Sequence, residues 1–160
     1  KGTEEVETEY RQGGRAHGLR SDYVWAIAED QHGDLWLGTD DSGLMRWNRR
    51  TDRVDHVALT GRRGDNLSNA RINDVLAASD GTIWVGTRSN GVLALTLEGR
   101  PIAQLLDATD AASARKRTIS SLAEAPDGSI WVGSQRGIHR SDRPSNRLTS
   151  YNNELTFSHI

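Results

Sequence analysis

The sequence predicts an all-β protein made of β-propeller blades, in which four-stranded antiparallel sheets repeat about every 47 residues. The first observation is the motif Gly-x-(Leu/Ile)-Trp-(Leu/Val)-Gly-(Thr/Ser), which occurs at residues 33–39, 81–87 and 128–134. The second is its spacing, because the three tryptophans of the motif are 48 and 47 residues apart. The third is that each copy has room for four short strands. A period of about 40–50 residues with four strands per unit is typical of propeller blades.

In the first unit we expect strands at residues 24–30, 34–39, 43–48 and 53–59. A His-Gly or Asp-Gly pair separates the first two strands of every unit. Such a pair between apolar runs is a strong hairpin signal, because glycine adopts a positive φ at little cost. On the second strand, Leu35 and Leu37 point to the face opposite Trp36. Both faces of the sheet are therefore apolar, which favours sheets stacked face to face.

The whole chain, residues 1–160, is expected to form a single partial propeller domain. We assign residues 3–12 to the outer strand of a preceding blade, 18–59, 66–106 and 114–151 to three blades, and 153–160 to the start of a further blade. The Ala-rich stretch 107–117 is interpreted as a long link between the second and third blades. Because a propeller covers its blade faces by closing a ring, we expect these residues to be part of a longer propeller and not a self-contained monomer.

Composition excludes several classes of function. The chain has 20 Lys and Arg against 22 Asp and Glu, so it lacks the basic stripe of a nucleic-acid-binding protein. It has no cysteine for disulfides or thiolate metal sites, and its five histidines lack metal-binding spacing. Neither a Gly-x-Ser-x-Gly elbow nor a phosphate-binding glycine loop occurs. Every apolar run is too short to cross a membrane. We therefore expect no catalysis, no cofactor and no metal in this segment.

The residues that repeat in every unit are interpreted as structural. Each tryptophan of the motif should fill the junction between neighbouring blades, where truncation to Ala typically costs about 3–5 kcal/mol. Each glycine two residues later should lie where a side chain would collide with the next strand or blade. The six structural positions are Trp36, Trp84, Trp131, Gly38, Gly86 and Gly133.

The residues that vary between units are free to bind a ligand. The loop that enters the first strand of a blade and the loop between its second and third strands should share one face, and function concentrates on such loops. Solvated loop polarity is the simpler explanation for any single residue. The candidate ligand-binding residues are Tyr23, Trp25, Arg71, Asn73, Arg88 and Arg136. The arginines favour an anionic or carbohydrate-derived ligand, such as a small molecule or an oligosaccharide.

The full unit, Leu-x4-Val-x2-Ile-x5-Gly-x-Leu-Trp-Leu-Gly-Thr-x3-Gly-Leu from residue 19 to residue 44, resembles the two-component regulator propeller repeat. The resemblance covers residues 19–160. It implies the periplasmic sensor domain of a bacterial receptor whose output is a histidine kinase, a hybrid regulator or a diguanylate cyclase. In that family, seven blades per propeller are usual, and membrane attachment comes from a segment downstream of the propeller. The implied partners are a ligand and the rest of the propeller or another copy of the chain.

Two alternatives to a sensor without chemistry stay open. Streptogramin-lyase-type enzymes also have Gly-x-(Leu/Ile)-Trp repeats, but those continue as Trp-Phe-(Thr/Ser)-Glu and use His and Glu with a magnesium ion. Here a glycine follows two residues after each tryptophan of the motif, and no histidine falls on the expected inner strands. A propeller that only binds other proteins cannot be distinguished from a sensor by sequence.

Overall fold

The computed structural model describes residues 10–13, 18–61, 64–105, 118–142 and 147–151. The described residues contain twelve strands and no helix. The expected link at 107–117, the start of a further blade at 153–160 and most of the expected strand at 3–12 lie outside them.

The strands form three four-stranded antiparallel sheets, each paired in chain order. The first sheet consists of β1 (Val24–Glu29), β2 (Leu35–Thr39), β3 (Leu44–Asn48) and β4 (Arg53–Val57). The second consists of β5 (Ile72–Ala77), β6 (Ile83–Thr87), β7 (Val92–Leu95) and β8 (Pro101–Leu105). The third consists of β9 (Ile119–Glu124), β10 (Ile130–Ser134), β11 (Gly137–Asp142) and β12 (Arg147–Tyr151).

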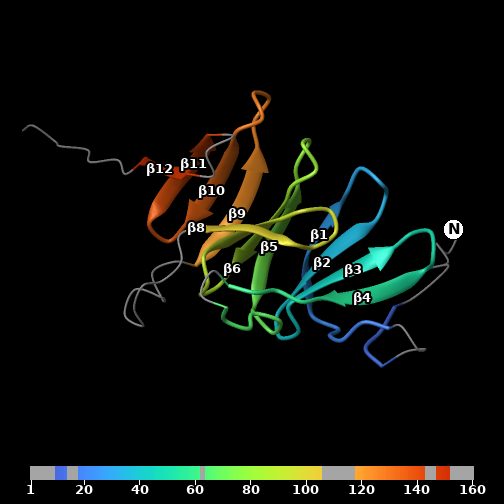
Figure 1. The fold of residues 1–160 in the computed structure, drawn as a ribbon. Helices are drawn as coiled ribbons and strands as arrows, with labels where there is room; N and C mark the ends of the chain where they lie inside the picture. The colour runs from blue at the N-terminus through green and yellow to red at the C-terminus, as the bar shows by residue number, and fades with distance from the viewer. Residues whose placement is uncertain (1–9, 14–17, 62–63, 106–117, 143–146, 152–160) are drawn as a thin grey trace, which may run out of the picture.

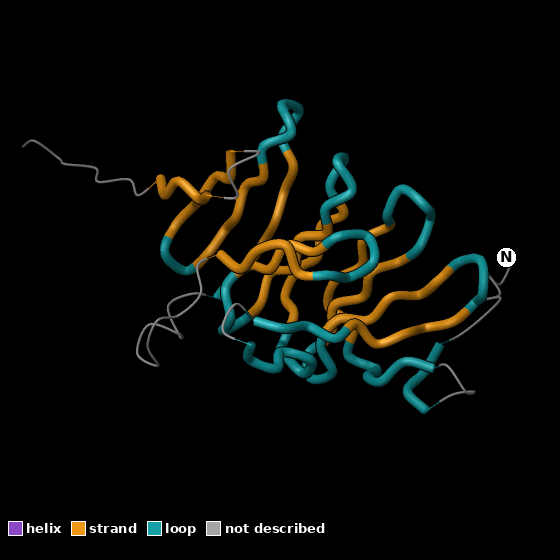
Figure 2. The backbone as a smooth tube through the Cα atoms, viewed as in Figure 1, coloured by secondary structure: helices purple, strands orange, loops and turns teal. Residues whose placement is uncertain are grey.

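The three sheets lie side by side as an open arc, with β5 in contact with both β1 and β9 (Figure 1). These three strands are the inner strands of their sheets. The arrangement confirms the predicted all-β fold and the partial propeller. Figure 2 shows the β1–β2, β5–β6 and β9–β10 hairpin turns on one side of the arc and the loops that enter β1 and β5 on the opposite side.

The predicted hairpin follows each inner strand, and its loop in the first sheet has the length that the expected strands 24–30 and 34–39 leave between them. In the first sheet the amide of Gly33 donates to the carbonyl of Asp30 (2.9 Å), and the amide of Asp30 donates to the carbonyl of Asp34 (2.9 Å). Three residues therefore form the loop, and only its glycine has a positive φ, +79°. The residue before this glycine is His32, and it keeps a negative φ. Histidine is therefore as acceptable at this position as the aspartate of the other two units.

Each sheet-to-sheet junction has its own apolar core. Trp36 packs between the first and second sheets with Leu44, Ile72, Ile83 and Leu93, all of them essentially inaccessible to solvent. Between the second and third sheets, the corresponding core consists of Trp84, Val92, Ile119, Ile130 and Val132. Trp131 differs from the other two motif tryptophans and is only half-buried. The reason is that no described fourth sheet covers its face.

Two of the motif glycines are positions of close approach between sheets. A Cβ on Gly38 would stand 2.6 Å from Cγ2 of Ile72 on the next inner strand, and a Cβ on Gly86 would stand 2.7 Å from Cγ2 of Ile119. At Gly133 the nearest group is the hydroxyl of Ser121, 2.5 Å away on the same sheet. A side chain at the first two positions would push neighbouring sheets apart.

A buried polar network links the first sheet to the second. Trp36 donates from Nε1 to Oδ2 of Asp30 (2.8 Å), and the guanidinium of Arg46 lies over the Trp36 ring at 5.1 Å from its centroid. Arg46 also pairs with Asp34 (2.7 Å) and donates to the carbonyl of Leu97 in the β7–β8 turn of the second sheet (2.6 Å). The charges of the two buried carboxylates are thus compensated by hydrogen bonds and a cation.

The second sheet lacks this network. Ala78 and Ala94 occupy the positions of Asp30 and Arg46, and Trp84 Nε1 is buried without a hydrogen-bond partner among the described residues. The two tryptophans therefore differ in polar environment although they share a repeat position.

Candidate ligand-binding face

One face of the arc is built from two kinds of loop that a backbone hydrogen bond holds together. The first enters each inner strand, and the second is the turn between the second and third strands of the same sheet. The amides of Asp40, Arg88 and Gln135 donate to the carbonyls of Tyr23 (3.1 Å), Arg71 (3.0 Å) and Thr118 (3.2 Å), respectively. The repeated bond gives three equivalent pairs of loops on one face, so that residues can be compared position by position.

The last residue of the repeat motif fixes each turn on this face. Thr39 donates from Oγ1 to the carbonyl of Gly43 (2.7 Å) and accepts from the amide of Ser42 (3.1 Å). Thr87 makes the same contact with Gly91 (2.8 Å), and Ser134 makes it with Gly137 (3.2 Å). The hydroxyl at this motif position therefore stabilises the turn that presents the variable residues.

Each inner strand begins with a β-bulge on the same face. Val24 pairs with Thr39 and Ala26 pairs with Gly38, so Trp25 is the extra residue. Asn73 takes this place in the second sheet, and Ser120 takes it in the third. Bulges redirect side chains and are frequent beside functional sites. A position of the inner strand that differs in all three units is thus also the one that lies outside the regular strand pairing.

A polar pocket lies between the second and third sheets on this face. Its volume is about 610 Å³, and it is lined by Asn73, Arg88, Ser89, Thr118 and Gln135. Asn73 donates from Nδ2 to the carbonyl of Ile119 (2.8 Å), which leaves its Oδ1 as an acceptor. Thr118 donates from its hydroxyl to the carbonyl of Arg88 (2.9 Å). The structure therefore brings two of the predicted residues, Asn73 and Arg88, into one site.

The equivalent junction between the first and second sheets is closed. Arg71 forms a bidentate ion pair with Asp40, in which Nε lies 2.7 Å from Oδ1 and Nη2 lies 2.7 Å from Oδ2. Nε of Arg71 also donates to the carbonyl of Asp40 (3.2 Å). Arg71 therefore joins the two sheets, and its guanidinium is already occupied.

The other predicted ligand-binding residues lie on the same face but do not line the pocket. Tyr23 directly precedes β1 and Trp25 lies on it, and they are 67% and 68% exposed. Arg136 is exposed in the β10–β11 turn, next to the pocket residue Gln135.

Sequence comparison had not selected Ser89, Thr118 or Gln135. All three stand at repeat positions equivalent to those that it did consider, so a strict position-by-position alignment of the three units could have found them. The side-chain type gave no signal, because serine, threonine and glutamine are ordinary loop residues.

Local contacts lower the pKa values of two ionisable groups near these turns, Asp41 and His139. The hydroxyl of Ser21, assisted by that of Ser42, lowers the pKa of Asp41 below its ordinary value by hydrogen bonding. Burial lowers the pKa of His139, and the positive charge of Arg136 acts in the same direction. His139 shares a hydrogen bond of 2.9 Å with the turn residue Ser134. Asp41 is therefore an anion and His139 a neutral imidazole at neutral pH.

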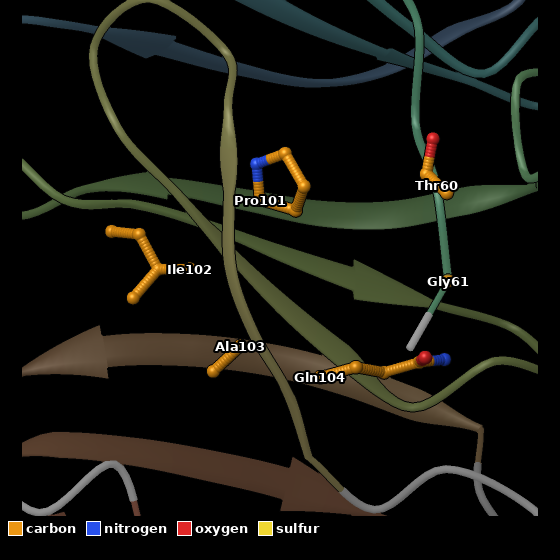
Figure 3. Close-up of a pocket in the computed structure, with 6 residues that line it drawn as sticks. All are labelled: Thr60, Gly61, Pro101, Ile102, Ala103 and Gln104. Atoms are coloured by element: carbon orange, nitrogen blue, oxygen red, sulfur yellow. The ribbon is translucent and has the colours of Figure 1, made fainter. Parts of the chain in front are cut away.

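A second pocket, of about 460 Å³, lies at the rim of the second sheet between β8 and the segment before the second blade (Figure 3). It is lined by Thr60, Gly61, Pro101, Ile102, Ala103 and Gln104. The described residues that line it carry no charged side chain, and the pocket stands apart from the loops described above.

In the part of the chain that the structure describes, no three His, Asp or Glu side chains are grouped to hold a metal ion. The described residues also contain no helix long and apolar enough to cross a membrane.

A family model described as "Two component regulator propeller" matches residues 18–41, 66–89 and 115–136. The three units of this chain are therefore repeats of the two component regulator propeller family, which confirms the resemblance seen in the sequence. No curated protein matches the chain significantly.

Solved structures share the fold at low sequence identity. The extracellular domain assigned to the hybrid two component system BT4673 of B. thetaiotaomicron is similar with a TM-score of 0.75 and 19% identity, over 97% of this chain and 22% of that one. The corresponding domain of BT3049 from the same organism gives a TM-score of 0.63 and 22% identity, over 81% and 18%. A catalytically inactive virginiamycin B lyase from Staphylococcus aureus, solved with quinupristin, gives 0.62 and 17%, over 81% and 41%. The chain spans about a fifth of the length of the two extracellular domains.

Proposed function

We propose that this chain is the signal-sensing propeller segment of a bacterial two-component receptor, located outside the cytoplasm and in the periplasm. It recognises a small molecule or an oligosaccharide on the loop face described above and performs no chemistry of its own. A histidine kinase or a diguanylate cyclase elsewhere in the receptor supplies the output. The repeat family and the printed descriptions of the two B. thetaiotaomicron domains support this proposal.

The observation that carries the proposal is the contrast between scaffold and loop face. At the scaffold positions the three units are nearly identical, and the same hydrogen bonds hold every turn. On the face that these turns present, equivalent positions hold Asp40, Arg88 and Gln135, or Trp25, Asn73 and Ser120. A rigid scaffold with variable polar and aromatic loops is the usual form of a recognition surface.

A lyase function is less well supported, although lyases share the fold. The inner strands β1, β5 and β9 contain no histidine. Of the histidines in the described residues, His32 lies in a hairpin turn on the opposite side, and His56 and His139 lie on β4 and β11. The inner strands of the described sheets therefore lack the histidine that a lyase of this type uses.

A protein-binding propeller is the second candidate, and one observation favours it. Tyr23, Trp25 and Ile27 are 67%, 68% and 63% exposed around β1, and exposed apolar residues that gather on one surface mark interaction sites. The same aromatics could instead stack on a sugar ring, since aromatic faces pack well against apolar surface.

Calorimetry on the full-length protein tests the proposal, with panels of neutral oligosaccharides, acidic oligosaccharides and small organic acids as titrants. We expect one compound to bind and its binding to be lost when Trp25, Arg71 and Arg88 are replaced together by alanine. The matched control replaces Arg53 and Arg100, which lie away from the loop face, and should bind normally. Binding that survives the triple replacement would remove the ligand site from this face, and turnover of quinupristin would favour the lyase.

A further inference from the structure

The two sheet-to-sheet junctions on the loop face have the same backbone arrangement, but the residues at equivalent positions differ in charge. In the first junction, Nε of Arg71 donates to the carbonyl of Asp40 (3.2 Å), and in the second, the hydroxyl of Thr118 donates to the carbonyl of Arg88 (2.9 Å). The entry residue of one sheet thus reaches the turn residue of the preceding sheet in both cases. Arg88 therefore stands where Asp40 stands, and Thr118 stands where Arg71 stands.

These different residues give the second junction a different charge from the first, and they leave a pocket in it. Asp40 and Arg71 neutralise each other in the first junction, and the long arginine side chain spans the gap. In the second junction, Thr118 is too short to span the gap, and a pocket of about 610 Å³ is present instead. Arg88 brings a positive charge, and none of the described residues that line this pocket is acidic. Among the described residues the Arg88 guanidinium forms no ion pair. The second junction thus has a cation where the first has a complete ion pair.

We propose that the pocket between the second and third sheets binds a carboxylate-bearing ligand, and that the ligand carboxylate pairs with Arg88 as Asp40 pairs with Arg71 in the neighbouring junction. This inference rests on the proposed sensing function and names the ligand class of its site. Planar guanidinium groups bind carboxylates through two parallel hydrogen bonds, and the Arg71–Asp40 pair shows that geometry in this protein.

The remaining lining residues fit the rest of such a ligand. Ser89 and Gln135 offer hydroxyl and amide groups, and Asn73 keeps Oδ1 as an acceptor because its Nδ2 is bonded to the carbonyl of Ile119. Donors and acceptors of this kind suit the hydroxyl groups of a sugar acid or a hydroxy acid. The shared chemistry is one carboxylate next to hydroxyl-bearing carbons.

The test is calorimetry on the full-length protein with three probes: D-galacturonate, the neutral sugar D-galactose, and succinate. We expect at least one carboxylate to bind tenfold or more tightly than galactose, since hydrogen bonds to charged groups are stronger than neutral ones. Binding of galacturonate alone identifies a sugar acid, and binding of succinate as well identifies the carboxylate as sufficient. Affinity should fall between 50 and 500 mM salt, because the Arg88 side chain is exposed.

Two variants separate this pocket from the rest of the face. Arg88→Gln should weaken carboxylate binding tenfold or more, whereas Arg100→Gln, which alters another exposed arginine of the same sheet, should leave it unchanged. The double variant Arg88→Asp/Thr118→Arg rebuilds the Asp40–Arg71 ion pair in the second junction. It should fold normally, because the first junction already accommodates that pair, and it should not bind the probe.

The inference fails if galactose binds as tightly as both carboxylates, or if Arg88→Gln or the double variant binds a carboxylate normally. Binding of only neutral ligands, abolished by the triple alanine replacement on the loop face, would overturn this inference and leave the proposed function intact. Failure of every compound in the panels and of all three probes to bind would overturn both.

Discussion

Replacing Trp36 and Trp84 by phenylalanine, one at a time, should destabilise the protein to different extents. Both indoles are essentially buried, with exposures of 0% and 1%, and both stand at the same repeat position. The loss of ring volume is therefore nearly equal in the two variants. The polar consequences differ, because Trp36 Nε1 donates to the buried carboxylate of Asp30 and Trp84 Nε1 has no partner among the described residues.

The magnitude follows from the two environments. Trp36→Phe leaves Oδ2 of the buried Asp30 without its 2.8 Å donor, and an unsatisfied buried polar group costs about 1–3 kcal/mol. Trp84→Phe removes a buried donor that was already unsatisfied, which offsets part of the packing loss. We therefore expect Trp36→Phe to lower the free energy of unfolding by about 1–3 kcal/mol more than Trp84→Phe.

Urea unfolding followed by tryptophan fluorescence and by far-ultraviolet circular dichroism measures both variants, and equal m-values are needed for the comparison. The reasoning is refuted if Trp84→Phe costs as much as Trp36→Phe or more. As a control, Trp36→Phe combined with Asp30→Asn should recover part of the difference, because the amide is neutral and its burial is less costly.

Three further outcomes follow from the fold. Gly38→Ala should lower the free energy of unfolding by more than about 1 kcal/mol, the usual cost of overpacking, because its Cβ would collide with Ile72. Gly133→Ala should cost less, because its Cβ meets the movable hydroxyl of Ser121. Equal losses of stability in urea unfolding would contradict this account of the packing. Because the folded state lowers the pKa of His139, its contribution to stability is complete above the unfolded pKa of about 6.5 and is lost as the pH falls through the folded value. His139→Gln should therefore flatten the pH dependence of the urea midpoint below about pH 6.5, and an unchanged profile would show that His139 does not titrate. The isolated 17.6 kDa chain should self-associate in sedimentation experiments, since Ile27 and Ile138 are 63% and 45% exposed, and a compact monomer would contradict this.

The sequence was sufficient to predict the strands because the repeat determines them. The expected strands at 24–30, 34–39, 43–48 and 53–59 differ from β1–β4 by no more than two residues at any end. The glycines at the hairpin turns were also found, and the expected strand ends left the three loop residues 31–33 between the first two strands. Asp-Gly is compatible with two-residue and three-residue loops, and the choice depends on the hydrogen bonds at the strand ends.

The sequence predicted which face of the propeller carries the candidate site, but it did not predict the position of the pocket on that face. Repeat comparison identified Asn73 and Arg88, which line the pocket, and also Arg71, whose guanidinium is occupied by Asp40. Which arginine is paired depends on the residue opposite it across a junction, and that residue belongs to another unit of the repeat. The polar network around Trp36 was missed for a related reason, since Asp30 and Arg46 are alanines in the second unit and so stand outside the shared motif.

Hydrogen exchange on the full-length protein, with and without a bound carboxylate ligand, tests the central claim most directly. The claim is that the signal is recognised on the loop face, in the pocket between the second and third sheets. Our account predicts protection of amides in the β6–β7 turn, at the entry to β9 and in the β10–β11 turn, with little change in the hairpin turns on the opposite side of the arc. Protection confined to those opposite turns, or to the rim pocket beside β8, would contradict it.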